Sequence, residues 1–127
     1  MEGLPEAWAD QSKALLGIKP LSDLEGCLQD IHWSLGSFGY FPSYALGNFY
    51  ASQLMEAFLA SHKTFEDEIR AGDFSSLLCW LREKVHRHGH GLSAERIVEE
   101  ATGRPLDAEP FFRRIAAKHA CFCKPMD

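Results

Sequence analysis

The chain has 127 residues, of which 46% are hydrophobic and 24% charged, enough for one globular domain with a modest core. Its formal net charge of -5 argues against nucleic-acid binding, which favours a basic patch. The sequence contains no run of about 20 apolar residues that could span a membrane. Its acidic N-terminus lacks an apolar signal core, so a cytoplasmic location is expected.

The first part of the chain predicts one helix and one shorter helical piece. Residues 5–16 should form the first helix, because a proline suits its start and Gly17 suits its end. Ser22 and Glu25 have the spacing of a capping box, in which each side chain satisfies the other residue's backbone amide. A short helical piece should follow, running toward His32.

Residues 33–42 contain two glycines and a proline and are expected to form a loop. A long helix should run over residues 43–61, because apolar side chains recur there at helical spacing. Further helices are expected over residues 64–70, 74–88, 93–101 and 107–120. Since no alternating strand pattern occurs, we expect an all-α fold: a compact array of about five to seven helices in a single domain, residues 1–127.

The stretch from Gly26 to Tyr50 is the most distinctive part of the sequence. It combines a His, a Trp, three Tyr and a Gln–Asp pair with several glycines, which is unusual for a core helix. The side chains that could donate hydrogen bonds to a developing oxyanion are Gln29, Asp30, His32, Tyr40 and Tyr44. Asp30 or a backbone carbonyl could hold the second ring nitrogen of His32. A purely structural role for His32 stays open.

The histidines and cysteines give no metal-binding pattern. His86, His88 and His90 lie close together, but no Glu follows His86, so the HExxH pattern of metallopeptidases is absent. This cluster is better explained as a solvated helix end that faces the negative end of the helix dipole. The four cysteines lack zinc-site spacing and are expected to be reduced thiols.

Residues 26–33, Gly-Cys-Leu-Gln-Asp-Ile-His-Trp, match the Gly-x-x-Gln-Asp-x-His-Trp motif of the carboxypeptidase Taq family of zinc metallocarboxypeptidases. Other segments that resemble the family are residues 4–8, 36–48, 82–89 and 101–106. The resemblance extends to about His119. The sequence departs from the pattern at Leu35, where Gly is usual, and at residues 121–127.

The resemblance implies an almost entirely helical enzyme that uses zinc to remove single residues from peptide C-termini. The family's HExxH helix, its third zinc ligand and its carboxylate-binding arginines all precede the segment that this chain resembles. The chain therefore resembles the C-terminal quarter of such an enzyme, as a fragment or a separately encoded remnant. We expect it to supply a substrate and oxyanion wall without metal ligands, and to be inactive alone.

The resemblance also assigns roles to individual residues. The residues matched to catalytic positions are His32, Tyr44 and Tyr40, and those matched to substrate-binding positions are Gln29, Asp30 and Trp33. His32 is expected to hydrogen-bond the substrate or the tetrahedral intermediate. Tyr44, with Tyr40, is expected to help stabilise the oxyanion. Gln29 and Asp30 would orient His32 and its loop, and Trp33 would pack against the groove wall.

Two other interpretations stay open. A piece of a larger helical enzyme exposes apolar faces, so the chain could be a non-catalytic protein that associates with itself or with a complementary N-terminal chain. The residues expected to drive association are Phe38, Phe41, Phe49, Tyr50 and Phe58. A self-contained hydrolase using His32, Asp30 and a nearby serine has less support, because Ser34, Ser37 and Ser43 lie outside any Gly-x-Ser-x-Gly elbow.

Overall fold

The computed structural model of the chain describes residues 3–122, without the side chains of residues 121 and 122. Within that range every regular element is a helix: six α-helices, one short 3₁₀ helix and no strand. The prediction of an all-α fold is therefore confirmed. The chain divides into two compact units, Met1–Ser43 and Tyr44–Asp127, each described here by itself. The expectation of one domain over residues 1–127 stays a prediction.

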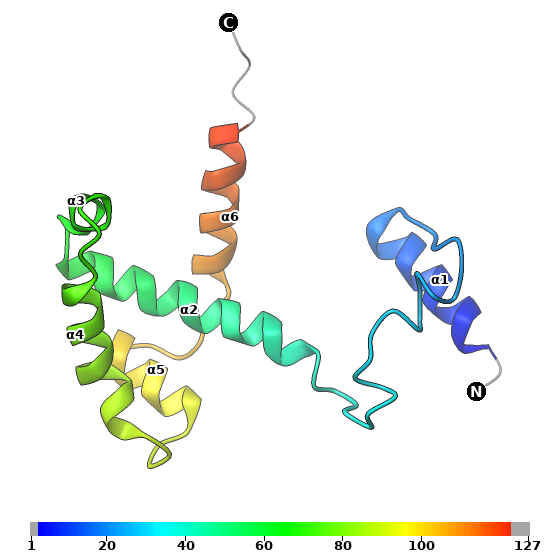
Figure 1. Cartoon of the computed structure of the whole chain (residues 1–127), viewed down its shortest axis with the longest axis horizontal. Helices are drawn as coiled ribbons and strands as arrows, with labels where there is room; N and C mark the ends of the chain where they lie inside the picture. Colours follow the sequence, from blue (N-terminus) through cyan, green and yellow to red (C-terminus); the bar gives the residue numbers. More distant parts are fainter. Residues whose placement is uncertain (1–2, 123–127) are drawn as a thin grey trace, which may run out of the picture. The chain divides into compact units, whose positions relative to one another are not determined.

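The first unit contains α1 (Leu4–Leu16), coloured blue in Figure 1. A proline lies in its first turn, where a missing backbone N–H costs nothing. Gly17 ends the helix with φ 73° and donates its N–H to the carbonyl of Lys13. Both features agree with the predicted first helix.

The helical piece predicted after Ser22 does not form, and residues 21–29 make successive turns instead. The Glu25 N–H donates to Ser22 Oγ (3.4 Å), but the Glu25 carboxylate accepts from the N–H of Leu21 (3.4 Å). The reciprocal capping box is therefore incomplete. Gly26 adds no helix propensity, and a side-chain turn at Asp30 offers the backbone a partner other than a helix.

Tertiary contacts hold these turns against α1. The rings of Trp8 and Trp33 meet edge to face, with centroids 5.3 Å apart. A Cβ atom at Gly26 would lie 3.3 Å from Trp8, Pro20 and the carbonyl of Ser22, so only glycine fits this position without displacing a neighbour. Cys27 is buried beside it.

The second unit is built around one long helix, α2, which begins at the boundary between the units (Figure 1). Its elements in chain order are α2 (Pro42–Ser61), α3 (Phe65–Arg70), α4 (Ser75–Lys84), η1 (His86–His88), α5 (Ala94–Thr102) and α6 (Glu109–Phe122). These agree with the predicted ranges to within a few residues. The helix predicted over residues 74–88 is interrupted, because Val85 leaves helical geometry with φ -123°.

Local capping explains where the later helices begin and end. Ser93 Oγ accepts the N–H of Arg96 (3.4 Å) and caps α5, the helix predicted over residues 93–101. Gly103 ends α5 with φ 77°. Asp107 Oδ1 accepts the N–H of Glu109 (3.0 Å), so the last helix starts two residues after the aspartate that was expected to begin it.

Two aromatic clusters pack α3, α4 and α6 against α2. Phe58 is fully buried; its ring stacks on His62 and meets Phe65 and Trp80 edge to face, with centroids 4.2, 4.8 and 5.8 Å away. This cluster joins α2 to α3 and α4. Nearer the start of α2, Phe49 meets Phe111 of α6 edge to face at 5.3 Å.

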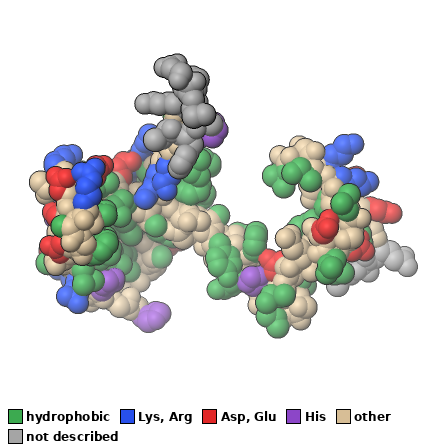
Figure 2. All heavy atoms as spheres, turned by 45° about the horizontal axis from the view of Figure 1, so that its top comes forward, with side chains coloured by type: hydrophobic (Ala, Val, Ile, Leu, Met, Phe, Trp, Pro, Cys, Tyr) green, Lys and Arg blue, Asp and Glu red, His purple; other side chains and the backbone are tan. Residues whose placement is uncertain are grey.

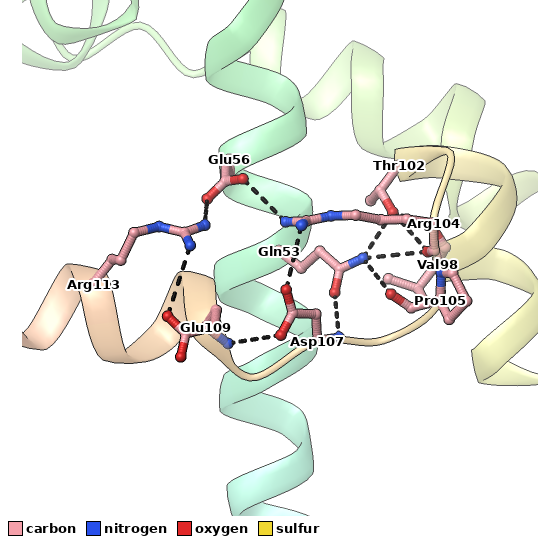
Figure 3. Close-up of polar contacts among 9 residues, drawn as sticks. All are labelled: Gln53, Glu56, Val98, Thr102, Arg104, Pro105, Asp107, Glu109 and Arg113. Carbon is pink, nitrogen blue, oxygen red and sulfur yellow. Dashed lines mark hydrogen bonds and ion pairs between the residues drawn. The ribbon is translucent and has the colours of Figure 1, made fainter.

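A buried glutamine joins α2 to the segment between α5 and α6 (Figure 3). Gln53 is 1% exposed. Its Nε2 donates to Thr102 Oγ1 (2.9 Å) and to the carbonyls of Arg104 (3.3 Å) and Pro105 (3.0 Å). Its Oε1 accepts the N–H of Asp107 (2.7 Å). Because both ends of the amide are bonded, the side chain can be buried without an unpaired polar atom.

Glu56, one turn further along α2, bridges two arginines (Figure 3). It pairs with Arg104 at 3.0 Å and with Arg113 of α6 at 2.7 Å. The hydrogen bond to Glu56 is the main reason that the pKa of Arg113 is raised. Gln53 and Glu56 thus fix the start of α6 beside α2 from the same helix face.

Large apolar side chains are exposed on both units, as the green patches in Figure 2 show. In the first unit Phe38 is 70% and Phe41 61% exposed. Phe58 was expected to be exposed and to drive association, and this is wrong because its ring fills the core beside Trp80. Tyr44, in the first turn of α2, is 56% exposed.

Candidate functional site

The centre of the candidate site is a contact between Asp30 and His32. Asp30 Oδ1 accepts the backbone N–H of His32 (2.7 Å) and also meets Nδ1 of the His32 ring. One carboxylate oxygen therefore serves both the backbone and the imidazole of the same residue. The side chains are about equally shielded, at 21% and 23% exposed. Of the two partners that the sequence left open for a ring nitrogen of His32, Asp30 is the one in contact with Nδ1.

Hydrogen bonding lowers the pKa of Asp30 below its ordinary value of 3.8. The largest cause is the bond from the His32 backbone N–H, and the bond and charge of the His32 ring act in the same direction. Desolvation opposes these effects. Because the bonds favour the charged form, Asp30 is a carboxylate at neutral pH.

Aromatic rings hold the plane of the His32 imidazole. The ring stacks on Tyr40, with centroids 5.1 Å apart and an angle of 27° between the planes. Phe41 meets it edge to face at 6.3 Å. The structure thus brings together three of the predicted site residues, Asp30, His32 and Tyr40, within a short loop of the first unit.

The other predicted site residues have different surroundings. Trp33 packs against Trp8 of α1, which anchors the loop that carries His32. The side chain of Gln29 is exposed, and its backbone N–H bonds to Gly26 (3.1 Å). Tyr44 lies in the first turn of α2, in the second unit, where its carbonyl accepts a bond from Asn48 (3.0 Å).

Two of the nearby serines, one in the loop and one in the first turn of α2, donate their hydroxyl groups to backbone carbonyls. Ser34 Oγ donates to the carbonyl of Ile31 (2.8 Å), and Ser43 Oγ donates to that of Tyr40 (2.7 Å). Such bonds stabilise turns. They favour a structural role for these serines over a nucleophilic one.

The donor groups for a zinc ion do not come together in the part of the chain that the structure describes. Among the side chains described, those of residues 3–120, no three from His, Cys, Asp or Glu lie close enough to hold one metal ion. His86 and His88 fall in η1, which ends at Gly89. The donor set present here therefore does not fit the tetrahedral site of a zinc peptidase.

Sequence reasoning missed the part that Gln53 and Glu56 play in holding the second unit together. The only available signal was the segment over residues 101–106, whose resemblance to the family coincides with the acceptors of Gln53. Nothing in the helical pattern of residues 43–61 singles out a glutamine as a central buried residue.

Solved structures place this fold among the metallocarboxypeptidases. Trypanosoma cruzi metallocarboxypeptidase 1 matches with a TM-score of 0.86 and 38% identity, over 94% of this chain and 25% of its own. The M32 carboxypeptidase of Deinococcus radiodurans matches with a TM-score of 0.87 and 36% identity, over 93% of this chain and 24% of its own.

The sequence comparisons identify the family. The family model "Carboxypeptidase Taq (M32) metallopeptidase" matches residues 1–119. Carboxypeptidase 1 of Bacillus subtilis is 41% identical over 94% of this chain and 24% of its own length. Thermostable carboxypeptidase 1 of Pyrococcus furiosus is 40% identical over 91% of this chain and 23% of its own. The chain belongs to the carboxypeptidase Taq family, and it spans about a quarter of the length of these relatives.

Proposed function

We propose that this chain supplies the substrate and oxyanion wall of a metallocarboxypeptidase that releases C-terminal amino acids from peptides. The Asp30–His32 pair stacked on Tyr40 carries the proposal, because it is a preorganised hydrogen-bonding group in a member of a metallopeptidase family. Preorganised groups lower a barrier since they need no reorientation during the reaction.

Each predicted residue has a role in this proposal. His32 hydrogen-bonds the substrate, and Asp30 orients its ring. The phenol groups of Tyr40 and Tyr44 donate to the oxyanion that forms as the scissile carbonyl is attacked. Trp33, packed on Trp8, holds the loop in place. Gln29, whose side chain is exposed, is available to contact the peptide.

The zinc of the family would be bound by a complementary N-terminal part, because the described residues here offer no fitting donor set. We therefore propose that the chain alone is inactive and that its partner is such a complementary polypeptide. Cys27 and Cys79 are free thiols, as is usual for proteins of reducing compartments, and we place the protein in the cytoplasm.

The proposal is tested by complementation. The purified chain is assayed for release of C-terminal amino acids from N-blocked peptides, with zinc or cobalt added, alone and together with Bacillus subtilis carboxypeptidase 1 that lacks its own C-terminal quarter. Release is expected only from the mixture and is expected to fall with His32→Ala. Release by the chain alone, or a mixture that is indifferent to His32→Ala, would count against the proposed role.

A second candidate function is non-catalytic association, favoured by the exposure of Phe38 and Phe41 in the first unit. Apolar side chains exposed close together are typical of interaction surfaces. Under this hypothesis the chain forms defined oligomers, and the state is read from sedimentation equilibrium. Defined oligomers in a chain that fails to complement any carboxypeptidase would favour this function over the first.

A further inference from the structure

We propose that Asp30 fixes neutral His32 as the Nδ1–H tautomer, so that Nε2 of His32 is a hydrogen-bond acceptor. The ring would then accept an N–H from the peptide substrate and would not donate to the oxyanion. The identity of the ligand as a peptide rests on the proposed function. The tautomer itself is argued from the geometry of Asp30 and His32.

The backbone of the loop orients the Asp30 carboxylate. Asp30 Oδ1 accepts the backbone N–H of His32 at 2.7 Å, which forms a turn closed by a side chain. The carboxylate is therefore oriented by the backbone, whatever the state of the imidazole. The same bond is the first cause of the lowered pKa of Asp30. An ionised carboxylate has no proton to donate and can only accept.

The contact with Asp30 decides which nitrogen of the His32 imidazole carries the hydrogen. Because Asp30 only accepts, the hydrogen between its Oδ1 and the Nδ1 of His32 belongs to the ring. A neutral imidazole carries a single N–H, and the hydrogen bond made by one nitrogen determines the role of the other. Nε2 then carries a lone pair. Free imidazole side chains in water favour the opposite tautomer, so Asp30 reverses the intrinsic preference.

The orientation of the His32 ring is fixed by its neighbours. Stacking on Tyr40 and the edge contact with Phe41 hold the ring plane, and the Asp30 contact fixes the rotation within that plane. The position of Nε2 is thereby set before any ligand binds. A peptide offers such an acceptor its amide N–H groups. The phenol O–H groups of Tyr40 and Tyr44 remain the donors suited to an oxyanion.

Nitrogen NMR tests the tautomer directly. Long-range ¹H–¹⁵N correlation spectra of the labelled chain are recorded at about pH 8, above the range in which histidine ordinarily titrates. The His32 ring is assigned as the signal set lost in His32→Gln. We expect a protonated-type shift for Nδ1 and a lone-pair-type shift for Nε2. The Nε2–H tautomer, or a ring protonated at both nitrogens, would overturn the inference.

Two variants separate the role of Asp30 from general structure. Asp30→Ala should move His32 toward the Nε2–H tautomer. The matched control is Asp73→Ala in the second unit, where Asp73 accepts the backbone N–H of Ser75 (2.8 Å) in a similar turn. This control should leave the His32 shifts unchanged. If Asp30→Ala fails to fold, the spectrum of the unmodified chain still decides the tautomer.

The two proposals can fail separately, because the tautomer is measured without substrate. A wrong tautomer in a chain that still completes an active carboxypeptidase would overturn the inference about His32 alone. The Nδ1–H tautomer in a chain that completes no activity would overturn the proposed function and leave the acceptor assignment intact.

Discussion

Asp30 orients the side chain of His32 from within a loop, where no helix supports it. A single carboxylate oxygen binds both the backbone N–H and the ring of His32. The two residues are only two positions apart, so the arrangement is local to one turn. Packing of Trp33 on Trp8 then ties this turn to α1.

The lowered pKa of Asp30 predicts a pH-dependent contribution to stability. A group whose pKa is lower in the folded state stabilises the fold above its unfolded pKa, and this contribution is lost as the pH falls through the folded pKa. The difference in unfolding free energy between the unmodified chain and Asp30→Asn should therefore be largest near pH 6 and shrink below about pH 4. Urea unfolding in a Trp80→Phe background reports the first unit through Trp8 and Trp33.

If the difference in unfolding free energy between the unmodified chain and Asp30→Asn stays constant from about pH 6 to below about pH 4, the charge of Asp30 does not contribute to stability as proposed. Asn keeps an oxygen that can accept the His32 N–H, so the variant removes the charge with little change in shape.

Among the polar side chains of the second unit, Gln53 should contribute most to its stability. Replacing Gln53 by Leu removes the partners of the part-buried N–H of Asp107 and of the Pro105 carbonyl. We expect the free energy of unfolding to fall by about 1–3 kcal/mol. Hydrogen exchange at the Asp107 amide should also accelerate. Gln29→Leu, at an exposed position, is the control, and an equal loss in both variants would refute the assignment.

Within the secondary-structure elements, two glycines lie in different kinds of local structure, one inside a helix and one in a packed turn. Gly47 lies inside α2, and a Cβ there would meet nothing within 4 Å. Gly26 lies in a turn where a Cβ would lie 3.3 Å from three neighbours. The same substitution should therefore have opposite effects at the two positions.

Gly47→Ala should raise the free energy of unfolding by about 0.5–1 kcal/mol, because alanine loses less backbone entropy in a helix. Gly26→Ala should lower it by about 1–3 kcal/mol through overpacking against Trp8 and Pro20. Denaturant unfolding of the two variants makes the comparison. A gain in stability from Gly26→Ala would show that its neighbours can move aside.

The elements that the sequence predicted correctly are those decided locally. Residues 43–61 follow a loop that ends in a proline and repeat their apolar residues at helical spacing, and Ser93 caps the helix that follows it. The piece after Ser22 was wrong because its conformation depends on Gly26 packing against Trp8, a contact that spacing does not reveal.

The candidate site could likewise be predicted only in part from the sequence. The motif identified Asp30 and His32, but the bond from Asp30 to the His32 backbone needs coordinates. Gln53 could not be singled out, because its partner Thr102 lies 49 residues further along the chain.

At the level of the whole molecule, large apolar side chains are exposed in both units. The exposed residues include Phe38 and Phe41 in the first unit. In the second unit a groove of about 720 Å³ beside α2, α3 and α6 is partly lined by Leu59 and Ile69. These surfaces agree with the proposal that a complementary polypeptide covers the chain.

Such surfaces predict association when the chain is purified alone. Sedimentation should show concentration-dependent species larger than a monomer, and Phe38→Ser with Phe41→Ser should weaken their formation. Phe49 was also expected to drive association, but Phe49→Asp is a poor test of it. Phe49 packs against Phe111 within the second unit, so the variant would disturb folding. A strictly monomeric chain at high concentration would contradict the prediction.

The most direct test of the central claim is a covalent chimera, in which residues 1–119 replace the matching quarter of Bacillus subtilis carboxypeptidase 1. We expect the chimera to release C-terminal amino acids from N-blocked peptides. We also expect His32→Ala to lower kcat/KM by about 5-fold to 150-fold, the loss that follows when a peptide N–H is left unpaired at a cost of about 1–3 kcal/mol. A chimera that folds, binds zinc and cleaves peptides equally well with His32→Ala would contradict the claim.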